Sequence, residues 1–261
     1  MTQIHPNIQR IVIPYKDIFT TVYILQYKSG VLVFDAAADG TDVDGYIVPA
    51  LEELKLARED VKYIFISHDH RDHSGGLPRL LEHCPNACVL SCSQRLKERL
   101  GAAEFIMPQD GQRVDDVFQV VTIPGHTADS MALLDERTNT LVTGDCLQLY
   151  GIFGSTDWAC AITLPEEHFQ ALNKVRAIQV DEILTAHDYH PCGCRYVGHE
   201  AVEQALDACA QPLEEIRQII RDNADMDDEM VRETFNAKDC RPTVSTRIVG
   251  FIRKALDENR L

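Results

Sequence analysis

The sequence predicts a layered α/β fold, and three observations lead to this prediction. The first third of the chain alternates segments typical of strands with segments typical of helices. Residues 105–145 are rich in strand-forming segments, and the part from 225 to 261 carries two further helical patterns. Two runs of strands and helices, with helices at both ends, are typical of sheets stacked against layers of helices.

The amino-terminal third begins with strand-like segments rich in β-branched and aromatic residues, at 9–14, 21–27 and 31–37. Residues 43–56 carry apolar side chains at helical spacing, and Pro49 in their interior predicts a kink. The segment "VKYIFIS" at 61–67 is almost continuously apolar, which is typical of a strand buried on both faces.

The rest of the chain continues this alternation. Short helices are expected at 75–84 and 93–100, and a strand at 87–91. Strands at 104–108, 118–125, 131–136 and 140–145 follow, and then a helix at 165–177, a strand at 182–187, a long helix from 198, and helices at 227–237 and 245–259.

The amino-acid composition argues against some classes of protein. The 261 residues include 41 acidic and 25 basic side chains, which give a net charge of −16. This balance argues against a general binder of large nucleic acids, because such proteins need a basic surface. The hydrophobic fraction of 45% is sufficient for a globular core.

The chain is expected to be cytoplasmic and not bound to a membrane. Its first residues lack the basic start, apolar run and cleavage site of a signal peptide, and no window approaches the ~20 apolar residues of a membrane span. The nine cysteines are an odd number, which fits reduced thiols better than a disulfide framework.

The stretch "SHDHRDHSGG" at 67–76 gathers three histidines and two aspartates within six positions. Alternate residues of an extended segment point the same way, so His68 and His70 can bind one metal ion. After the chain turns, Asp72 and His73 can face a second ion. Gly75 and Gly76 are expected to let the backbone pass close to the ions.

Three more candidate ligands follow strand-like runs far along the chain: His126, Asp145 and His187. Together with the cluster they provide five histidines and two aspartates, enough for two divalent ions. Imidazole and carboxylate ligands suit zinc, and also iron or manganese.

These motifs resemble those of the metallo-β-lactamase-fold hydrolases, which share the order His-x-His-x-Asp-His, Gly-His, Gly-Asp and a late His. The resemblance implies a four-layer αββα sandwich over residues 1–200, with a helical segment at 201–261 packed on the same domain. It implies that His68, His70 and His126 hold one metal, that Asp72, His73 and His187 hold the other, and that Asp145 bridges. It also implies that Asp35 supports the ligand loop.

The sequence differs from two subfamilies of these hydrolases, and the members that it resembles are therefore the glyoxalase II-like or lactonase-like ones. The commonest zinc β-lactamases have a cysteine among the ligands of the second metal, whereas here Asp145 takes the bridging position and Cys146 is only its neighbour. The oxygen-reducing di-iron relatives have glutamate where this chain has His70. Antibiotic hydrolysis and a flavoprotein partner are therefore not expected.

The resemblance implies a hydrolase of a small ester, thioester or lactone that attacks with a metal-bound hydroxide. Asp72 is a candidate proton acceptor, and Tyr189 or His190 a candidate oxyanion contact or proton donor. The neighbouring Pro191 and Gly193, however, favour a solvated loop for both.

Further segments leave alternatives open. Three aromatic residues, Tyr150, Phe153 and Trp158, either line an apolar substrate pocket or pin their loop to the core. The basic residues Arg241, Arg247, Arg253 and Lys254 either attract an anionic substrate or form a solvated helix face. The C-terminal helices either cover the metal cleft or form a homodimer contact.

Three other functions compete with hydrolysis of a small ester. The same ligand frame with a single iron serves persulfide oxidation in some relatives, so an oxidoreductase is one alternative. A hydrolase of small phosphodiesters is another. A binding module without catalysis is disfavoured because the ligand set is intact.

Overall fold

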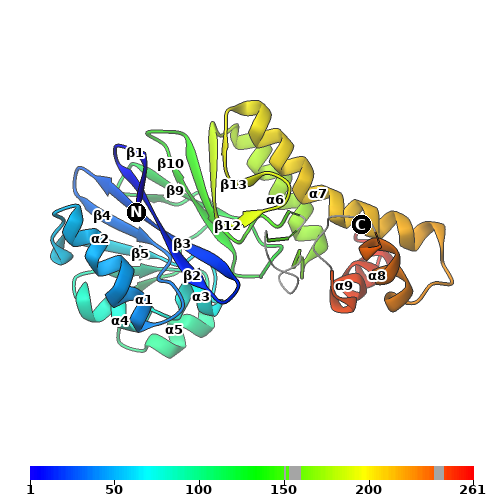
Figure 1. Cartoon of the computed structure of the whole chain (residues 1–261), viewed down its shortest axis with the longest axis horizontal. Helices are drawn as coiled ribbons and strands as arrows, with labels where there is room; N and C mark the ends of the chain where they lie inside the picture. Colours follow the sequence, from blue (N-terminus) through cyan, green and yellow to red (C-terminus); the bar gives the residue numbers. More distant parts are fainter. Residues whose placement is uncertain (150, 153–159, 238–243) are drawn as a thin grey trace. The chain divides into compact units, whose positions relative to one another are not determined.

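The structure is a computed structural model that describes residues 1–149, 151–152, 160–237 and 244–261. The chain divides into two compact units (Figure 1). Unit 1 contains residues 1–122 and 131–137, and unit 2 contains residues 123–130 and 138–261.

Unit 1 is built on a seven-stranded sheet, in which the strands follow one another in chain order. Strands β1 to β4 are antiparallel, and β4 to β7 are parallel. The strands are β1 (Thr2–His5), β2 (Ile8–Tyr15), β3 (Ile18–Tyr27), β4 (Gly30–Phe34), β5 (Val61–Phe65), β6 (Cys88–Leu90) and β7 (Phe105–Ile106). Because parallel strands end at a common edge, the segments that follow β4 and β5 lie side by side.

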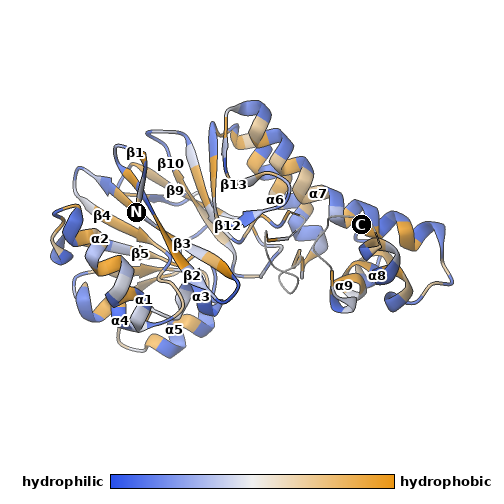
Figure 2. Cartoon of the chain, in the orientation of Figure 1, coloured by the Kyte–Doolittle hydropathy of each residue, from blue (hydrophilic) through white to orange (hydrophobic). Residues whose placement is uncertain are grey.

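Helices cover one face of this sheet. They are α1 (Gly40–Asp42), α2 (Val48–Glu53), α3 (Arg71–Ser74), α4 (Leu77–His83) and α5 (Gln94–Leu100), with a π-helical turn η1 (Val43–Ile47) and a 3₁₀ turn η2 (Arg58–Asp60). Fully buried side chains of the sheet, such as Val33 and Ile64, pack with Ile47 of η1 and Leu80 of α4. Figure 2 shows the hydrophobic colouring of β4 and β5.

The helix expected at 43–56 differs in one respect. It begins as a π-helical turn and continues as α2, which places Pro49 in the first turn of α2. Because α1, η1 and α2 follow one another without a break, the missing N–H of Pro49 leaves a carbonyl of the preceding turn without its donor, and that turn is π-helical. The expected kink stays a prediction.

Unit 1 also contains a short antiparallel meander of β8 (Arg113–Val114), β9 (Phe118–Thr122) and β10 (Met131–Asp135). All five residues of β10 are buried. The backbone N–H of Met131 donates to the carbonyl of Ser67 at 2.9 Å, so β10 is tied directly to the start of the histidine-rich segment.

Unit 2 combines three strands with four helices. The strands are β11 (Thr140–Gly144), β12 (Glu182–Tyr189) and β13 (Gly193–Val197), with β11 and β12 parallel and β13 antiparallel to β12. The helices are α6 (Pro165–Ile178), α7 (His199–Asp222), α8 (Asp228–Asn236) and α9 (Thr246–Asp257). Helix α7 contacts β12, β13 and α6, and then α8 and α9.

A second apolar core holds the carboxyl-terminal helices together. Leu213 and Ile216 of α7 pack with Phe235 of α8 and Ile252 of α9. Helix α7 runs without interruption from the strands into this cluster. The expected boundary at residue 200 falls near the first residue of α7. The division into 1–200 and 201–261 stays a prediction. Among the described helices, none has both the length and the apolar character that a bilayer span requires.

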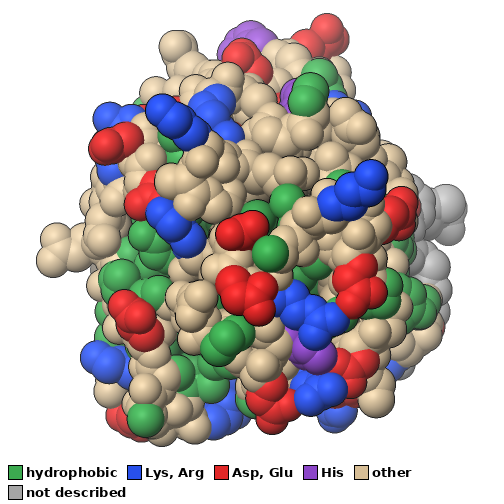
Figure 3. Space-filling view, turned by 90° about the vertical axis from the view of Figure 1, so that its left-hand side faces the viewer, with side chains coloured by type: hydrophobic (Ala, Val, Ile, Leu, Met, Phe, Trp, Pro, Cys, Tyr) green, Lys and Arg blue, Asp and Glu red, His purple; other side chains and the backbone are tan. Residues whose placement is uncertain are grey.

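Charges of both signs are interspersed on one side of unit 1. Figure 3 shows Lys and Arg side chains lying among Asp and Glu side chains on this face. On the helical side of unit 1, Arg79 pairs with Asp44 at 2.9 Å and with Glu82 at 2.6 Å. Such exposed ion pairs contribute little to the free energy of unfolding, but they place each positive charge beside acidic neighbours.

Gly75 and Gly76 are required for a reason that differs from the expected one. A Cβ on Gly75 would lie 2.0 Å from the carbonyl oxygen of Ala38, and one on Gly76 would lie 2.1 Å from that of Ala36. The close approach is thus to the segment after β4, where the Gly76 N–H donates to the Ala37 carbonyl.

We expect Gly76→Ala to lower the free energy of unfolding by about 3 kcal/mol, because backbone atoms must move to admit the methyl group. Urea denaturation measures this. The matched control is Gly45→Ala in η1, where a Cβ meets nothing within 4 Å. This control is expected to stabilise the chain by up to about 1 kcal/mol. Equal effects of the two substitutions would contradict the steric argument.

Candidate metal centre

A buried carboxylate organises the histidine-rich segment of unit 1. Asp35 directly follows β4 and is fully buried. Its Oδ1 accepts the Ser67 N–H at 2.8 Å, and its Oδ2 accepts the Ser67 hydroxyl at 3.0 Å and Nδ1 of His73 at 2.7 Å. Asp35 therefore contacts both ends of the ligand loop, as the resemblance implies.

The bond from Nδ1 of His73 also fixes the tautomer of this ring. A carboxylate oxygen accepts, so Nδ1 carries the proton and Nε2 keeps a lone pair for a metal. Burial raises the pKa of the Asp35 carboxyl, while His73 and the two bonds from Ser67 act in the opposite direction.

The four candidate ligands of unit 1 form two pairs. Nε2 of His68 lies 2.9 Å from Nδ1 of His70, and Nε2 of His73 lies 3.3 Å from Oδ2 of Asp72. Two ligand atoms on one tetrahedral zinc ion, each about 2.0–2.2 Å from it, are roughly 3.2–3.6 Å apart. Both pairs are close to this spacing, so each offers two adjacent ligand positions.

Asp69, between the two histidines of the first pair, anchors the loop on its other side. Its Oδ1 accepts the Ser74 hydroxyl at 2.8 Å and Nη2 of Arg99 at 3.0 Å, and its Oδ2 lies 3.5 Å from Nε of Arg95. The side chain of Asp69 is only 8% exposed. This anchoring role was not predicted, because nothing in the motif separates an anchoring aspartate from a ligating one.

The three candidate ligands of unit 2 meet at one carboxylate. His126 lies in the loop after β9, Asp145 directly follows β11, and His187 lies within β12 rather than at its end. Oδ1 of Asp145 is 3.0 Å from Nε2 of His187, and Oδ2 is 4.0 Å from Nε2 of His126. Asp145 thus presents one oxygen to each histidine, which is the arrangement that a bridging ligand needs.

A backbone carbonyl and a threonine hydroxyl hold His126 in place. Its Nδ1 is 2.8 Å from the carbonyl oxygen of Ala161. A carbonyl only accepts, so Nδ1 carries the proton and Nε2 is left as the ligand atom. The Thr163 hydroxyl donates to the backbone carbonyl of His126 at 2.7 Å.

The expected solvated loop position is wrong for Tyr189. This residue ends β12 and is fully buried, and its hydroxyl donates to Oδ1 of Asp145 at 2.8 Å. The loop prediction failed because the strand extends to Tyr189 instead of ending at His187. The geometry makes Tyr189 a support of Asp145, and a direct catalytic role for it stays a prediction.

Gln148 is a buried polar residue that the sequence analysis missed. Its Nε2 donates to the Asp145 carbonyl at 2.9 Å and to the Tyr189 hydroxyl at 3.3 Å, and its Oε1 accepts the Ala161 N–H at 3.0 Å. It thereby links the supports of His126 and Asp145. A lone glutamine in "GDCLQL" gives no signal, since its other partners, Tyr189 and Ala161, are distant in sequence.

The other candidates fall outside this arrangement. His190 is half-buried, and burial lowers the pKa of its imidazole although Asp188 acts against this shift. The three aromatic pocket candidates have no described contact here: Tyr150, Phe153 and Trp158 lie outside the described residues.

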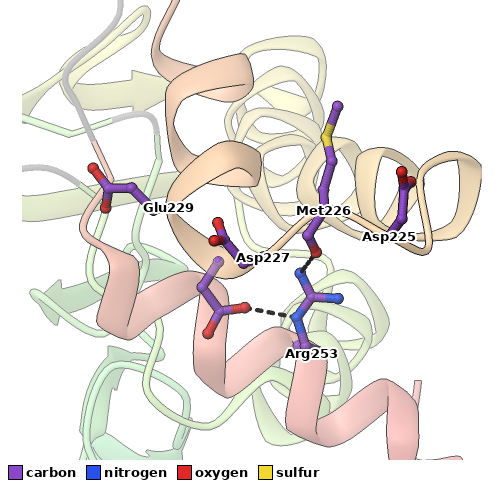
Figure 4. A pocket seen from close by; sticks show the side chains of 6 residues that line it. Asp225, Met226, Asp227, Glu229 and Arg253 are labelled. Atoms are coloured by element: carbon purple, nitrogen blue, oxygen red, sulfur yellow. Dashed lines mark hydrogen bonds and ion pairs between the residues drawn. The ribbon is translucent and has the colours of Figure 1, made fainter.

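Within the expected basic cluster, Arg253 is engaged by acidic and backbone groups. It donates to Oδ1 of Asp228 at 2.6 Å and to the carbonyl of Met226 at 2.7 Å (Figure 4). Four acidic side chains line this pocket, and Arg247 stacks on Phe251. Arg241 lies outside the described residues. The surroundings of Arg253 do not favour an anionic ligand.

Known proteins resemble this chain in sequence and in structure. The family model of the metallo-beta-lactamase superfamily matches residues 15–89, which include Asp35 and the histidine-rich segment. A metallo-beta-lactamase family protein from Thermus thermophilus is similar in structure, with a TM-score of 0.64 and 17% identity over 98% of this chain and 95% of that chain. The chain has a metallo-β-lactamase fold. The expected αββα fold class and the resemblance to this superfamily are confirmed.

Relatives by sequence include a hydrolase. The protein YobT of Bacillus subtilis (strain 168) is 29% identical over 76% of this chain and 88% of its own length. The hydroxyacylglutathione hydrolase of Aliivibrio fischeri (strain ATCC 700601 / ES114) is 29% identical over 56% of this chain and 55% of its own length. The chain thus spans about half the length of this curated relative. The expected metallohydrolase agrees with what such relatives are named.

Proteins of other function share the fold as well. Rubredoxin oxygen:oxidoreductase from Desulfovibrio gigas has a TM-score of 0.64 and 13% identity, over 96% of this chain and 74% of that chain. At this identity the likeness concerns the fold, and the function must be argued from the site.

We expect Asp69→Asn to lower the free energy of unfolding by about 2 kcal/mol, because two charge-assisted contacts of a buried carboxylate are weakened. Urea denaturation of the metal-free protein measures this. The matched control is Glu82→Gln, whose partner Arg79 is a surface residue and whose side chain is 65% exposed. The control should change stability by less than about 0.5 kcal/mol. Similar values for both would show that Asp69 is no anchor.

We expect Tyr189→Phe to weaken metal binding by about tenfold, since Asp145 loses the hydroxyl that orients it. Competition with a chromophoric chelator measures the affinity. Tyr196→Phe is the matched control, because that buried hydroxyl donates to the Gly193 carbonyl at 2.6 Å and contacts no candidate ligand in the described structure. Unchanged affinity in Tyr189→Phe would remove this residue from the support of Asp145.

Proposed function

We propose that this chain is a dinuclear zinc-dependent hydrolase of a small thioester, ester or lactone. The proposal is carried by one observation: within each unit, the ligand atoms of the candidate residues lie close enough together to bind a metal ion. Unit 1 offers the pairs His68–His70 and Asp72–His73, and unit 2 offers a carboxylate with one oxygen toward each of two histidines.

We further propose the ligand assignment that the resemblance implies. In this assignment His68, His70 and His126 hold one ion, Asp72, His73 and His187 hold the other, and Asp145 bridges them. The resemblance to the metallo-β-lactamase superfamily supports it, and seven ligands are enough for a dinuclear site.

The donor set fits divalent zinc, with iron or manganese as alternatives. It combines imidazole nitrogens and carboxylate oxygens, and no thiolate is included. Bound divalent ions supply Lewis acidity, which lowers the pKa of water and polarises a carbonyl or phosphoryl oxygen. The rings of His73 and His126 are already held as neutral tautomers with Nε2 available, which is the form that ligation requires.

The charges of the ligands suit attack on a carbonyl. Asp72 and Asp145 contribute two negative charges, and neutral histidines contribute none. With two divalent ions and an attacking hydroxide, this ligand set would leave one positive charge in excess, which would stabilise negative charge that develops on a substrate oxygen. Asp72, whose side chain is 13% exposed, would hold a proton at its carboxylate during the attack. Asp145 stays fixed through Tyr189 and Gln148.

The substrate class rests on relatives. Two proteins named hydroxyacylglutathione hydrolase align with 56% and 67% of this chain, and a thioester is the bond that we propose for this site. An oxidoreductase that oxidises persulfides and a hydrolase of small phosphodiesters are the alternatives. They differ from the proposal in metal identity, in oxygen dependence and in the bond that is broken.

The setting of the enzyme is also a proposal. We propose a cytoplasmic protein that acts on a small molecule, binds neither large nucleic acids nor membranes, and forms a homodimer through its C-terminal helices. None of the eight cysteines among the described residues is joined in a disulfide, which supports a reducing compartment.

We expect the purified protein to contain two equivalents of zinc and to hydrolyse thioesters, with lactones slower and phosphodiesters inert. Elemental analysis and a panel of the three substrate classes, with oxygen consumption followed in parallel, measure this. His68→Ala from unit 1 and Asp145→Ala from unit 2 should each lose metal and reduce kcat at least about a thousandfold. His199→Ala, an exposed residue, is the control.

Several outcomes would overturn the proposal. Full hydrolysis after dialysis against a strong chelator, with metal shown to be absent, would exclude a metal-dependent reaction. One equivalent of iron with oxygen uptake would favour the oxidoreductase. Loss of metal in one ligand variant but not in the other would argue against this ligand assignment.

A further inference from the structure

A buried histidine lies behind the loop that carries His126. His168 belongs to α6 and is only 1% exposed. Burial lowers the pKa of its imidazole to about 4, although its bond to the Cys209 carbonyl acts in the opposite direction. The ring is therefore neutral at physiological pH.

The ring is anchored on one side to α7. Nε2 of His168 is 3.0 Å from the carbonyl oxygen of Cys209, and because a carbonyl only accepts, Nε2 carries the proton. A backbone carbonyl has two lone pairs, so the Cys209 carbonyl can accept from His168 as well as within α7.

On its other side, His168 fills the space behind Gly125. Gly125 has a φ of +154°, and a Cβ added there would lie 2.9 Å from both Cα and Cβ of His168 and 3.0 Å from its Nδ1. Nδ1 is buried and has no hydrogen-bond partner among the described residues. The ring thus contacts Gly125 by packing, and only its Nε2 bond fixes its orientation.

Gly125 directly precedes His126, and the segment before α6 holds both residues. The carbonyl of Gly125 accepts the N–H groups of Thr163 and Leu164, each at 2.9 Å. The N–H of His168 in turn donates to the Leu164 carbonyl at 2.9 Å. A continuous set of contacts therefore runs from α7 through His168 to the residue before the candidate ligand.

We propose that His168 is a positioning residue for His126. Its Nε2–H bond to α7 fixes the ring that supports Gly125, and Gly125 sets the position from which His126 reaches a metal. This inference rests on the proposed function in that it takes His126 as a ligand. It adds a residue that touches neither metal nor substrate, and it makes α7 part of the support of the site.

The test compares two amides of different length in the metal-binding protein. The amide nitrogen of glutamine reaches about as far as Nε2 of histidine, whereas that of asparagine reaches only as far as Nδ1. We expect His168→Gln to retain zinc affinity within about twofold and His168→Asn to lower it about tenfold. Competition with a chromophoric chelator measures affinity, and thermal unfolding of the metal-free proteins shows whether both variants are folded.

A double-mutant cycle separates positioning from a general loss of structure. In the His126→Ala background, His168→Asn should cause no further loss of zinc affinity, because its effect acts through His126. The same loss in both backgrounds would overturn the proposal, and so would wild-type affinity in His168→Asn. His199→Asn, at an exposed position at the start of α7, is the matched control and should bind zinc as the unmodified chain does.

The cycle also keeps the two proposals distinguishable. If His126→Ala retains full zinc affinity, His126 is not a ligand, and the proposed centre itself is wrong. If His126→Ala loses zinc while both His168 variants bind it normally, the centre stands and only the role of His168 is refuted.

Discussion

The buried carboxylate of Asp35 is the constraint on which the ligand loop of unit 1 depends. It lies at the end of β4, in a place where desolvation disfavours its charge. Three donors from a single loop compensate for this cost: the N–H and hydroxyl of Ser67 and the imidazole of His73. Because the same bonds orient His73, the energy that stabilises the buried charge also fixes a ligand ring in its ligating tautomer.

Unit 2 supports its ligands by different chemistry. His126 is oriented by a backbone carbonyl, and Asp145 by a tyrosine hydroxyl and the amide of Gln148. These donors and acceptors are neutral, so no further buried charge has to be compensated there. A histidine that donates to a carboxylate is a more basic ligand than one that donates to a neutral carbonyl. We therefore expect the ligand histidine supported by Asp35 in unit 1 to be more basic than the one supported by a carbonyl in unit 2.

Much of the fold and the identity of the candidate ligands could be predicted from the sequence, since strands show their apolar pattern locally and the histidine-rich motif is compact. The supports could not be predicted. Apart from the Asp145 carbonyl, the hydrogen-bond partners of Gln148 and His168 are 13 to 41 residues away, and nothing local distinguishes these two residues from other polar residues. Tyr189 was misplaced because Pro191 and Gly193 resemble a loop even where a strand continues to their edge. Gly75 and Gly76 were correctly singled out, but the backbone of residues 36–38, rather than the ions, sets their size limit.

Helix α7 takes part in two separate packing arrangements. Its first half packs on β12 and β13, and its second half forms a core with α8 and α9. In an α-helix each added residue rotates everything beyond it by about 100°. An insertion between the two halves would therefore turn Leu213 and Ile216 away from their core while the first half kept its place. Length changes in this helix can be tolerated only in whole turns, whereas the segment 223–227 before α8 is free of this phase requirement.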